Sequence, residues 1–251
     1  MTKIALITGG SRGLGKSMAL HLADHGRDVI ITYHSQKEQA QAVVESIEDM
    51  GQKAVALQLD VREASSFSAF ANTVREAMTE NWGRDDFDYL INNAGSGIWA
   101  EYEKTSEEQF DNMMKEHVKA PFFLTQALLP MIKQGGRILN VSSGLTRMIM
   151  PGYAAYAVMK TAVEGLSLYM AKELGPRGIA VNTLAPGAIE TDFGGGVVRD
   201  NADLNAEIAS ITSLGRVGLP EDIGGAVASI LADEAGWINA QRIEVSGGQR
   251  L

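Results

Sequence analysis

The feature that most constrains the fold of this 251-residue chain is a regular alternation of short apolar runs and longer amphipathic stretches. The runs are rich in β-branched residues, whereas the stretches between them repeat apolar side chains with the period of an α-helix. The expected strands are 3–8, 28–33, 54–59, 87–91, 137–142, 179–184 and 242–245. The expected helices are 13–26, 36–51, 63–80, 106–133, 153–174 and 220–232, of which the fourth starts at a capping-box pattern, Thr105-Ser-Glu-Glu.

Strands that are apolar along their whole length are typical of a parallel sheet covered by helices on both faces. The length suits one large α/β domain with one core. We therefore expect a single doubly wound, Rossmann-type domain over residues 1–251, with a parallel sheet of about seven strands. Residues 187–218 break the alternation and contain Gly194-Gly195-Gly196. We interpret this segment as a substrate lid, with a disordered surface insertion as the alternative.

Composition excludes several classes of function. The net charge of −9, without clustered Lys and Arg, argues against nucleic-acid binding. The absence of cysteine excludes disulfides and thiolate metal sites, and His21, His25, His34 and His117 lack metal-ligand spacing, so no metal is expected. No apolar run approaches the roughly 18 residues of a membrane span, and the N-terminal residues do not resemble a signal peptide. We expect a soluble cytoplasmic protein.

A glycine-rich turn follows the first expected strand and opens the first expected helix. It runs from Thr8 to Gly15 as TGGSRGLG. Glycines at such a junction allow a tight turn and close approach of the backbone to a pyrophosphate, which the helix N-terminus attracts. A simple strand-to-helix turn is the alternative, but the position at the first junction favours a dinucleotide site.

The end of the second expected strand indicates which dinucleotide binds. An NAD site usually has an acidic residue there for the ribose 2′-hydroxyl. Here the strand ends Tyr33-His34-Ser35, without an acid. Arg12, inside the glycine turn, can offer its positive charge to a 2′-phosphate, and His34 and Ser35 can add hydrogen bonds. NADP(H) is therefore favoured over NAD(H).

Tyr156 and Lys160 stand four residues apart on an expected helix, so both side chains lie on one helix face. A phenol has a reference pKa of about 10, and a nearby ammonium favours its ionised form. The pair is a candidate tuned acid/base. Tyr153, seven residues before Lys160, is a competing tyrosine.

Taken in order, these motifs resemble the short-chain dehydrogenase/reductase family over the whole chain, in its TGxxxGxG and Tyr-xxx-Lys branch. The chain is similar in particular to the 3-oxoacyl-(acyl-carrier-protein) reductases. Ser143, thirteen residues before Tyr156, stands where that family has its catalytic serine. The cofactor contacts that the resemblance and the glycine turn imply are Gly9, Ser11, Arg12, Gly13, Leu14, Gly15, Tyr33, His34, Ser35, Asp60, Val61, Asn92, Ala94, Gly95, Tyr156, Lys160, Pro186, Gly187, Ile189 and Thr191.

The resemblance implies NADPH-dependent, reversible reduction of a ketone or 3-oxoacyl substrate to the alcohol. Tyr156 would exchange a proton with the carbonyl oxygen and Ser143 would orient that carbonyl. Lys160 would lower the pKa of Tyr156 and bind the nicotinamide ribose. His117 stands where the family usually has an asparagine that helps to relay protons. A histidine that titrates near neutral pH can also relay protons, and a packing residue is the alternative.

Two other functions stay open at this point. An enoyl-thioester reductase would use Tyr153, and a redox-sensing regulator would bind NADP(H) without catalysis. Arg147, Arg199 and Arg216 are the candidate contacts for an acidic carrier protein. The family resemblance also implies a homotetramer. The expected walls of the substrate pocket are Trp99, Met148, Met150, Tyr153 and Phe193.

Overall fold

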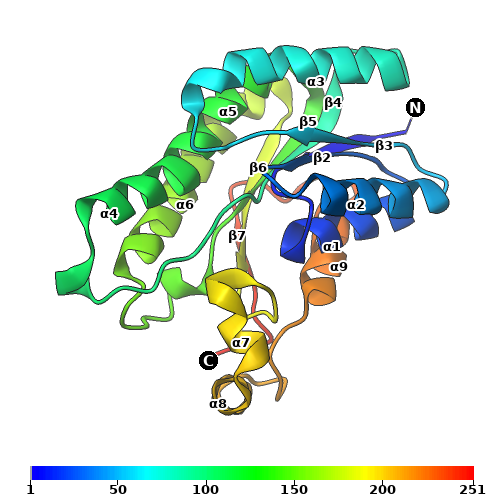
Figure 1. Cartoon of the computed structure of the whole chain (residues 1–251). Coiled ribbons are helices and arrows are strands. Elements are labelled where there is room, and N and C mark those ends of the chain that lie inside the picture. The colour runs from blue at the N-terminus through cyan, green and yellow to red at the C-terminus, as the bar shows by residue number, and fades with distance from the viewer. Residues whose placement is uncertain (1) are drawn as a thin grey trace.

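The structure is a computed structural model, and it describes residues 2–251. Within these residues, seven strands form one parallel sheet in the order β3-β2-β1-β4-β5-β6-β7 (Figure 1). The single doubly wound sheet predicted from the alternation is confirmed. The strands are β1 Ile4–Ile7, β2 Asp28–Tyr33, β3 Ala54–Gln58, β4 Phe87–Asn92, β5 Ile132–Val141, β6 Ala180–Pro186 and β7 Arg242–Val245.

Helices cover both faces of the sheet. In Figure 1, α1, α2 and α9 lie on one side, whereas α3, α5 and α6 lie on the other and α4 packs beside α6. The helices are α1 Gly13–Asp24, α2 Lys37–Asp49, α3 Phe67–Trp82, α4 Glu107–Met114, α5 Ala120–Leu128, α6 Ala154–Leu174, α7 Val197–Asp200, α8 Ala202–Ser210 and α9 Pro220–Ile230.

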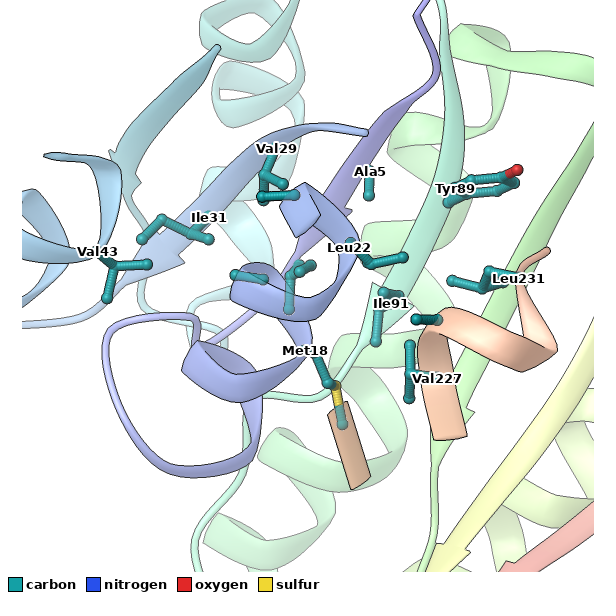
Figure 2. Close-up of a cluster of buried hydrophobic side chains, with 14 of the residues drawn as sticks. Ala5, Met18, Leu22, Val29, Ile31, Val43, Tyr89, Ile91, Val227 and Leu231 are labelled. Carbon is teal, nitrogen blue, oxygen red and sulfur yellow. The ribbon is translucent and has the colours of Figure 1, made fainter. Parts of the chain in front are cut away.

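The apolar side chains of the central strands divide between two buried clusters. In β1, Ala5 and Ile7 pack under α1 and α9, while Ile4 and Leu6 pack under α3 and α5. Figure 2 shows the first cluster, where Met18 of α1 lies near the strands and α9. Successive strand residues face opposite sides of a sheet, so a strand covered on both sides must be apolar throughout.

The expected helix 106–133 is wrong as a single element. It is divided into α4, a π-helical turn at Lys115–Lys119, and α5, and β5 already begins at Ile132. Pro130 lacks the amide that a continuing helix needs, so the helical path ends before the strand. The capping box joins Ser106 to Gln109, not Thr105 to Glu108, because the helix begins one residue later.

The segment 187–218 contains more regular structure than a loop. It holds α7 and α8, which lie below the sheet in Figure 1. Gly194, Gly195 and Gly196 all have positive φ, at 61°, 79° and 80°. Three successive left-handed residues need glycine, since a side chain disfavours this conformation. They turn the chain sharply between β6 and α7.

Candidate active site

A cavity of about 750 Å³ opens at the carboxyl ends of the strands. Its walls come from the segments after β1, β2, β3, β4, β5 and β6, including the segment 187–218. The cavity lies where β1 and β4 are neighbours and the chain connections lead to opposite halves of the sheet. In open α/β sheets, ligands bind in this crevice. Its size is that of a small-molecule site.

The glycine turn forms the floor of one end of the cavity. A Cβ added to Gly15 would lie 2.1 Å from the carbonyl oxygen of Gly9, so only glycine fits there. Gly9 and Gly13 have positive φ, at 69° and 54°. Helix α1 starts without a side-chain cap and without an acidic residue in its first turn. Such a free helix N-terminus under a glycine cradle fits the pyrophosphate of a dinucleotide.

The segment after β4 is tied to the glycine turn. The side chain of Asn93 donates to the carbonyl oxygens of Thr8 (2.9 Å) and Gly9 (3.2 Å). Asn93 lines the cavity, whereas the neighbouring Asn92 does not. The Asn92 side chain is buried and donates to Thr125 and Asn140. The expectation of an Asn92 cofactor contact therefore needs correction, because adjacent residues at a strand end point to opposite sides.

The other expected cofactor residues all meet in this one cavity. Arg62, which was not predicted, lines it as well and donates through Nη2 to the carboxylate of Asp60 at 3.0 Å. This hydrogen bond lowers the pKa of Asp60. The predicted residues that line the cavity are Gly9, Ser11, Arg12, Gly13, Leu14, Gly15, Tyr33, His34, Ser35, Asp60, Val61, Ala94, Gly95, Tyr156, Lys160, Pro186, Gly187, Ile189 and Thr191.

Ser143, Tyr156 and Lys160 converge in the middle of the cavity. Tyr156 and Lys160 occupy neighbouring turns of α6, and both side chains are buried. The Nζ atom of Lys160 lies 5.5 Å from the centre of the Tyr156 ring and donates to the carbonyl oxygen of Val141 at 2.7 Å. Ser143 follows β5 and lines the same cavity as Tyr156 and Lys160. The three side chains can therefore act on one carbonyl group.

The pKa of Tyr156 differs from the expectation. Burial raises this pKa well above its usual value and outweighs the lowering effect of the hydrogen bond with Ser143. The expected lowering by Lys160 is not found, and burial lowers the pKa of Lys160 itself to about 8. The sequence could not predict this, because it does not reveal how deeply the pair is buried.

A charged network holds the segment that carries Ser143. Glu164 lies one turn after Lys160 on α6 and accepts hydrogen bonds from Ser142 (2.6 Å) and Arg242 (2.9 Å). Arg242, on the edge strand β7, also donates to the carbonyl oxygen of Ser143 at 3.3 Å. Sequence reasoning missed these residues because β7 and α6 are far apart along the chain. These hydrogen bonds hold the backbone of Ser143 in position.

His117 lies in the π-helical turn and is buried against Tyr156, with the two ring centres 5.1 Å apart and the planes at 88°. Its Nε2 donates to the carbonyl oxygen of Ser96 at 2.8 Å. Its Nδ1 has no hydrogen-bond partner among residues 2–251. Burial, and then the charge of Lys160, lower the pKa of His117 well below its usual value. His117 is thus neutral near pH 7. This differs from the expectation of a histidine that titrates near neutral pH.

Glu116, next to His117, was not predicted from the sequence. Its carboxylate accepts a hydrogen bond from the hydroxyl of Ser96 at 2.6 Å, and both residues line the cavity. Consecutive residues of the π-helical turn therefore hold the side chain and the carbonyl of Ser96. Such turns are frequent at functional sites because the extra residue re-aims neighbouring side chains. The periodicity of an ordinary α-helix in the sequence does not reveal such a π-helical turn.

The substrate end of the cavity is lined by Met148, Met150, Tyr153 and Phe193, as expected. Phe193, just before the three glycines, packs on the ring of Tyr156 with a centre distance of 5.4 Å. Trp99 differs from the expectation: its side chain lies outside the cavity and is 62% exposed.

Two contacts with glycine explain these positions. A Cβ on Gly97 would lie 2.2 Å from the Phe193 ring, so glycine is required for this closed position. A Cβ on Gly152 would lie 2.2 Å from Nε1 of Trp99, which therefore packs over that glycine. The absence of a side chain at 97 and 152 thus decides where both aromatic rings lie.

The three arginines considered for an acidic carrier protein are all engaged in ion pairs. Arg147 binds Glu244, Arg199 binds Asp192 and Asp200, and Arg216 binds Asp222. Each of these candidate contacts is therefore already paired with a carboxylate of the chain itself. Among residues 2–251, no helix is long and apolar enough to cross a membrane. The same residues contain no group of three His, Asp or Glu side chains that could hold a metal.

Comparison with known proteins agrees with this geometry. Residues 9–250 match a family described as Enoyl-(Acyl carrier protein) reductase. The tetrahydroxynaphthalene reductase PfmaG of Pestalotiopsis fici is 36% identical, over 98% of this chain and 91% of that protein. The chain therefore belongs to the short-chain dehydrogenase/reductase family.

Two solved structures are close in fold and sequence. The promiscuous reductase LugOII, which catalyses keto-reduction at C1 during lugdunomycin biosynthesis, has a TM-score of 0.94 and 37% identity, covering 99% of this chain and 98% of that one. The landomycin C-6 ketoreductase LanV, with bound NADP and rabelomycin, has a TM-score of 0.90 and 34% identity, covering 99% and 96%. The fold is thus that of ketoreductases in this family.

Proposed function

We propose that this protein reduces a ketone to the secondary alcohol with NADPH, in a reversible reaction. The observation that carries the proposal is the convergence of Ser143, Tyr156 and Lys160 in the cavity that the glycine turn also lines. Carbonyl reduction needs a hydride at carbon and a proton at oxygen. NADPH supplies the hydride when it is bound on the glycine turn.

The residues of the chain supply the rest of the chemistry. Tyr156 holds the proton that the carbonyl oxygen receives, and its raised pKa keeps it protonated for the reductive direction. Ser143 offers a second hydrogen bond to the same oxygen. Phe193 and the buried ring of His117 exclude water from both sides of Tyr156. In a water-poor site, hydrogen bonds to a developing oxyanion are stronger than in solvent.

NADP(H) as the cofactor is supported by the end of β2 and by relatives. Tyr33, His34 and Ser35 line the cavity at the end of β2 and none of them is acidic, while the Asp60 carboxylate, 3.2 Å from Nε2 of His34, is paired with Arg62. Arg12 lines the same cavity. The structural relative LanV was solved with NADP bound. A carboxylate in this position would repel a 2′-phosphate, so its absence permits one.

A planar, partly aromatic ketone is the proposed substrate class. Phe193, Tyr153, Met148 and Met150 line the substrate end, and aromatic and methionine side chains bind flat apolar ligands well. LanV is solved with rabelomycin and PfmaG is named for a tetrahydroxynaphthalene. A 3-oxoacyl thioester is the second candidate, and the ion-paired arginines argue against a carrier-bound form.

A substrate panel tests the proposal. Oxidation of NADPH is followed by its absorbance with polycyclic aromatic ketones, simple ketones, a 3-oxoacyl thioester and an enoyl thioester. We expect turnover to be highest with an aromatic ketone. Turnover of the enoyl thioester alone would establish the enoyl reductase that uses Tyr153. NADPH binding without any turnover would favour the non-catalytic regulator.

A homotetramer is proposed from the apolar surface of α4, α5 and α6. The exposed apolar side chains on these helices are Phe110, Met114, Phe122, Phe123, Val158, Leu168 and Tyr169. Contiguous apolar surface on a monomer marks an interaction site. Light scattering should give four chains per particle, and Leu168→Glu should lower that number. A cytoplasmic location stays a prediction from the sequence.

A further inference from the structure

Arg12, the cation proposed for the 2′-phosphate of NADPH, already has an anionic partner in the lid segment. Its Nη1 atom lies 3.5 Å from Oδ2 of Asp192. Both side chains line the same cavity, and the neighbouring Thr191 side chain lies 3.8 Å from a Cβ built on Gly13. The glycine turn and the lid therefore touch through one guanidinium.

Asp192 has a second and closer partner. Arg199 donates through Nη1 to Oδ1 of Asp192 at 2.7 Å and also binds both carboxylate oxygens of Asp200. Loss of Arg12 would thus leave the Asp192 carboxylate still paired. The Arg12 contact is longer than a normal hydrogen bond and exposed on both sides, so a stronger anion can displace it.

We infer that Asp192 is a determinant of cofactor selectivity, because its carboxylate and the 2′-phosphate of NADPH compete for Arg12. A phosphate offers Arg a bidentate, doubly charged partner and wins over one distant carboxylate oxygen. NADH lacks this group and leaves the Arg12–Asp192 pair in place. Asp192 thereby weakens the binding of NADPH but not of NADH.

The test measures the dissociation constants of NADPH and NADH by calorimetry with the full-length protein. In Asp192→Asn we expect NADPH to bind roughly 1.5- to 5-fold more tightly, the range of one exposed ion pair, and NADH to bind unchanged. Asp200→Asn is the matched control, since it removes the same charge from the same segment but has no contact with Arg12 among the described residues. It should leave both constants unchanged.

A double-mutant cycle identifies the partner. In an Arg12→Met background, Asp192→Asn should no longer affect NADPH binding, and high salt should reduce the effect in the parent. An equal gain in Asp200→Asn, a gain for both cofactors, or a gain that persists without Arg12 would overturn the inference. The inference rests on the proposed cofactor. Tighter binding of NADH than NADPH by the wild type would instead overturn that proposal.

Discussion

The two ends of the cavity are built in different ways. The cofactor end consists mainly of backbone at the ends of strands, with Gly9 and Gly15 allowing neighbouring backbone segments to approach closely. The substrate end consists of side chains that come from the segment after β5, from the start of α6 and from the segment 187–218. The cofactor end depends on glycines that have no side chain, whereas the substrate end depends on which side chains pack together. Mutations at the two ends should therefore affect different properties, namely cofactor binding at the first and substrate binding at the second.

The largest effect is expected at the junction of the two ends. Tyr156→Phe should lower kcat by roughly 10²- to 10⁴-fold, the usual contribution of a positioned acid, and leave the dissociation constant of NADPH almost unchanged. Steady-state kinetics and a cofactor titration measure both. The matched variant Tyr153→Phe should keep most of the activity. Retention of activity in Tyr156→Phe would place the proton donor at Tyr153.

Gly15→Ala should damage the cofactor end selectively. The added methyl would overlap the carbonyl oxygen of Gly9, which is backbone and cannot move without opening the turn. We expect NADPH to bind at least roughly 10-fold more weakly, with a lower melting temperature. Gly225→Ala, inside α9 where the nearest contact is an ordinary 3.9 Å, should bind NADPH normally. It should also gain about 0.5–1 kcal/mol of stability from helix propensity.

Lys160 links the chemistry to the pH dependence of stability. Its pKa of about 8, against 10.5 when unfolded, corresponds to a stability penalty of about 3 kcal/mol below pH 8. Between pH 8 and 10.5 the unfolded chain binds more protons than the folded protein, so wild-type stability rises with pH there. Lys160→Met should be inactive, but its melting temperature should exceed that of the wild type at pH 7.

The difference between the melting temperatures of Lys160→Met and the wild type should become smaller as the pH approaches 10.5. Thermal denaturation of both proteins from pH 6.5 to 10.5 measures it. A difference that is constant over this range would mean that a buried charge is not its source. This would leave the loss of the hydrogen bond to Val141 and altered packing as explanations.

The smallest of these effects is expected at the lid. Phe193→Ala should raise the KM of a bulky aromatic ketone roughly 5- to 10-fold, because the ring that packs on Tyr156 is also a wall for the substrate. The dissociation constant of NADPH should change less than twofold. Leu214→Ala, an exposed residue outside the cavity, is the control. If Phe193→Ala raised the KM of the ketone and the dissociation constant of NADPH by the same factor, the two ends of the cavity would not be separate binding regions.

The sequence predicted the cofactor end better than the substrate end, for a physical reason. A strand followed by a glycine turn and a helix is local, so Thr8–Gly15 could be interpreted from eight neighbouring residues. Asn92 was assigned to the cavity where Asn93 lines it, because the facing of a residue at a strand end depends on register. Arg62 and Glu116 were missed, since nothing in their local pattern separates them from solvated charges.

The candidate catalytic residues were predicted from helix spacing and from the family resemblance, but their ionisation was not. A spacing of four residues places Tyr156 and Lys160 on one face of any α-helix. The π-helical turn that buries His117 depends on how α4 and the turn itself pack against α6. The bracing of Ser143 by Glu164 and Arg242 joins residues 78 positions apart. Such contacts follow only from the assembled sheet.

By itself, the sequence determined the parallel sheet and predicted the glycine turn and the Tyr156–Lys160 pair, because strand period, helix period and glycine geometry are local properties. Ser143 was predicted from the family resemblance. The tertiary structure decided how strongly these groups ionise and what covers them. Burial raises the pKa of Tyr156 and lowers those of Lys160 and His117. Desolvation depends on every neighbour that displaces water, and those neighbours come from all parts of the chain.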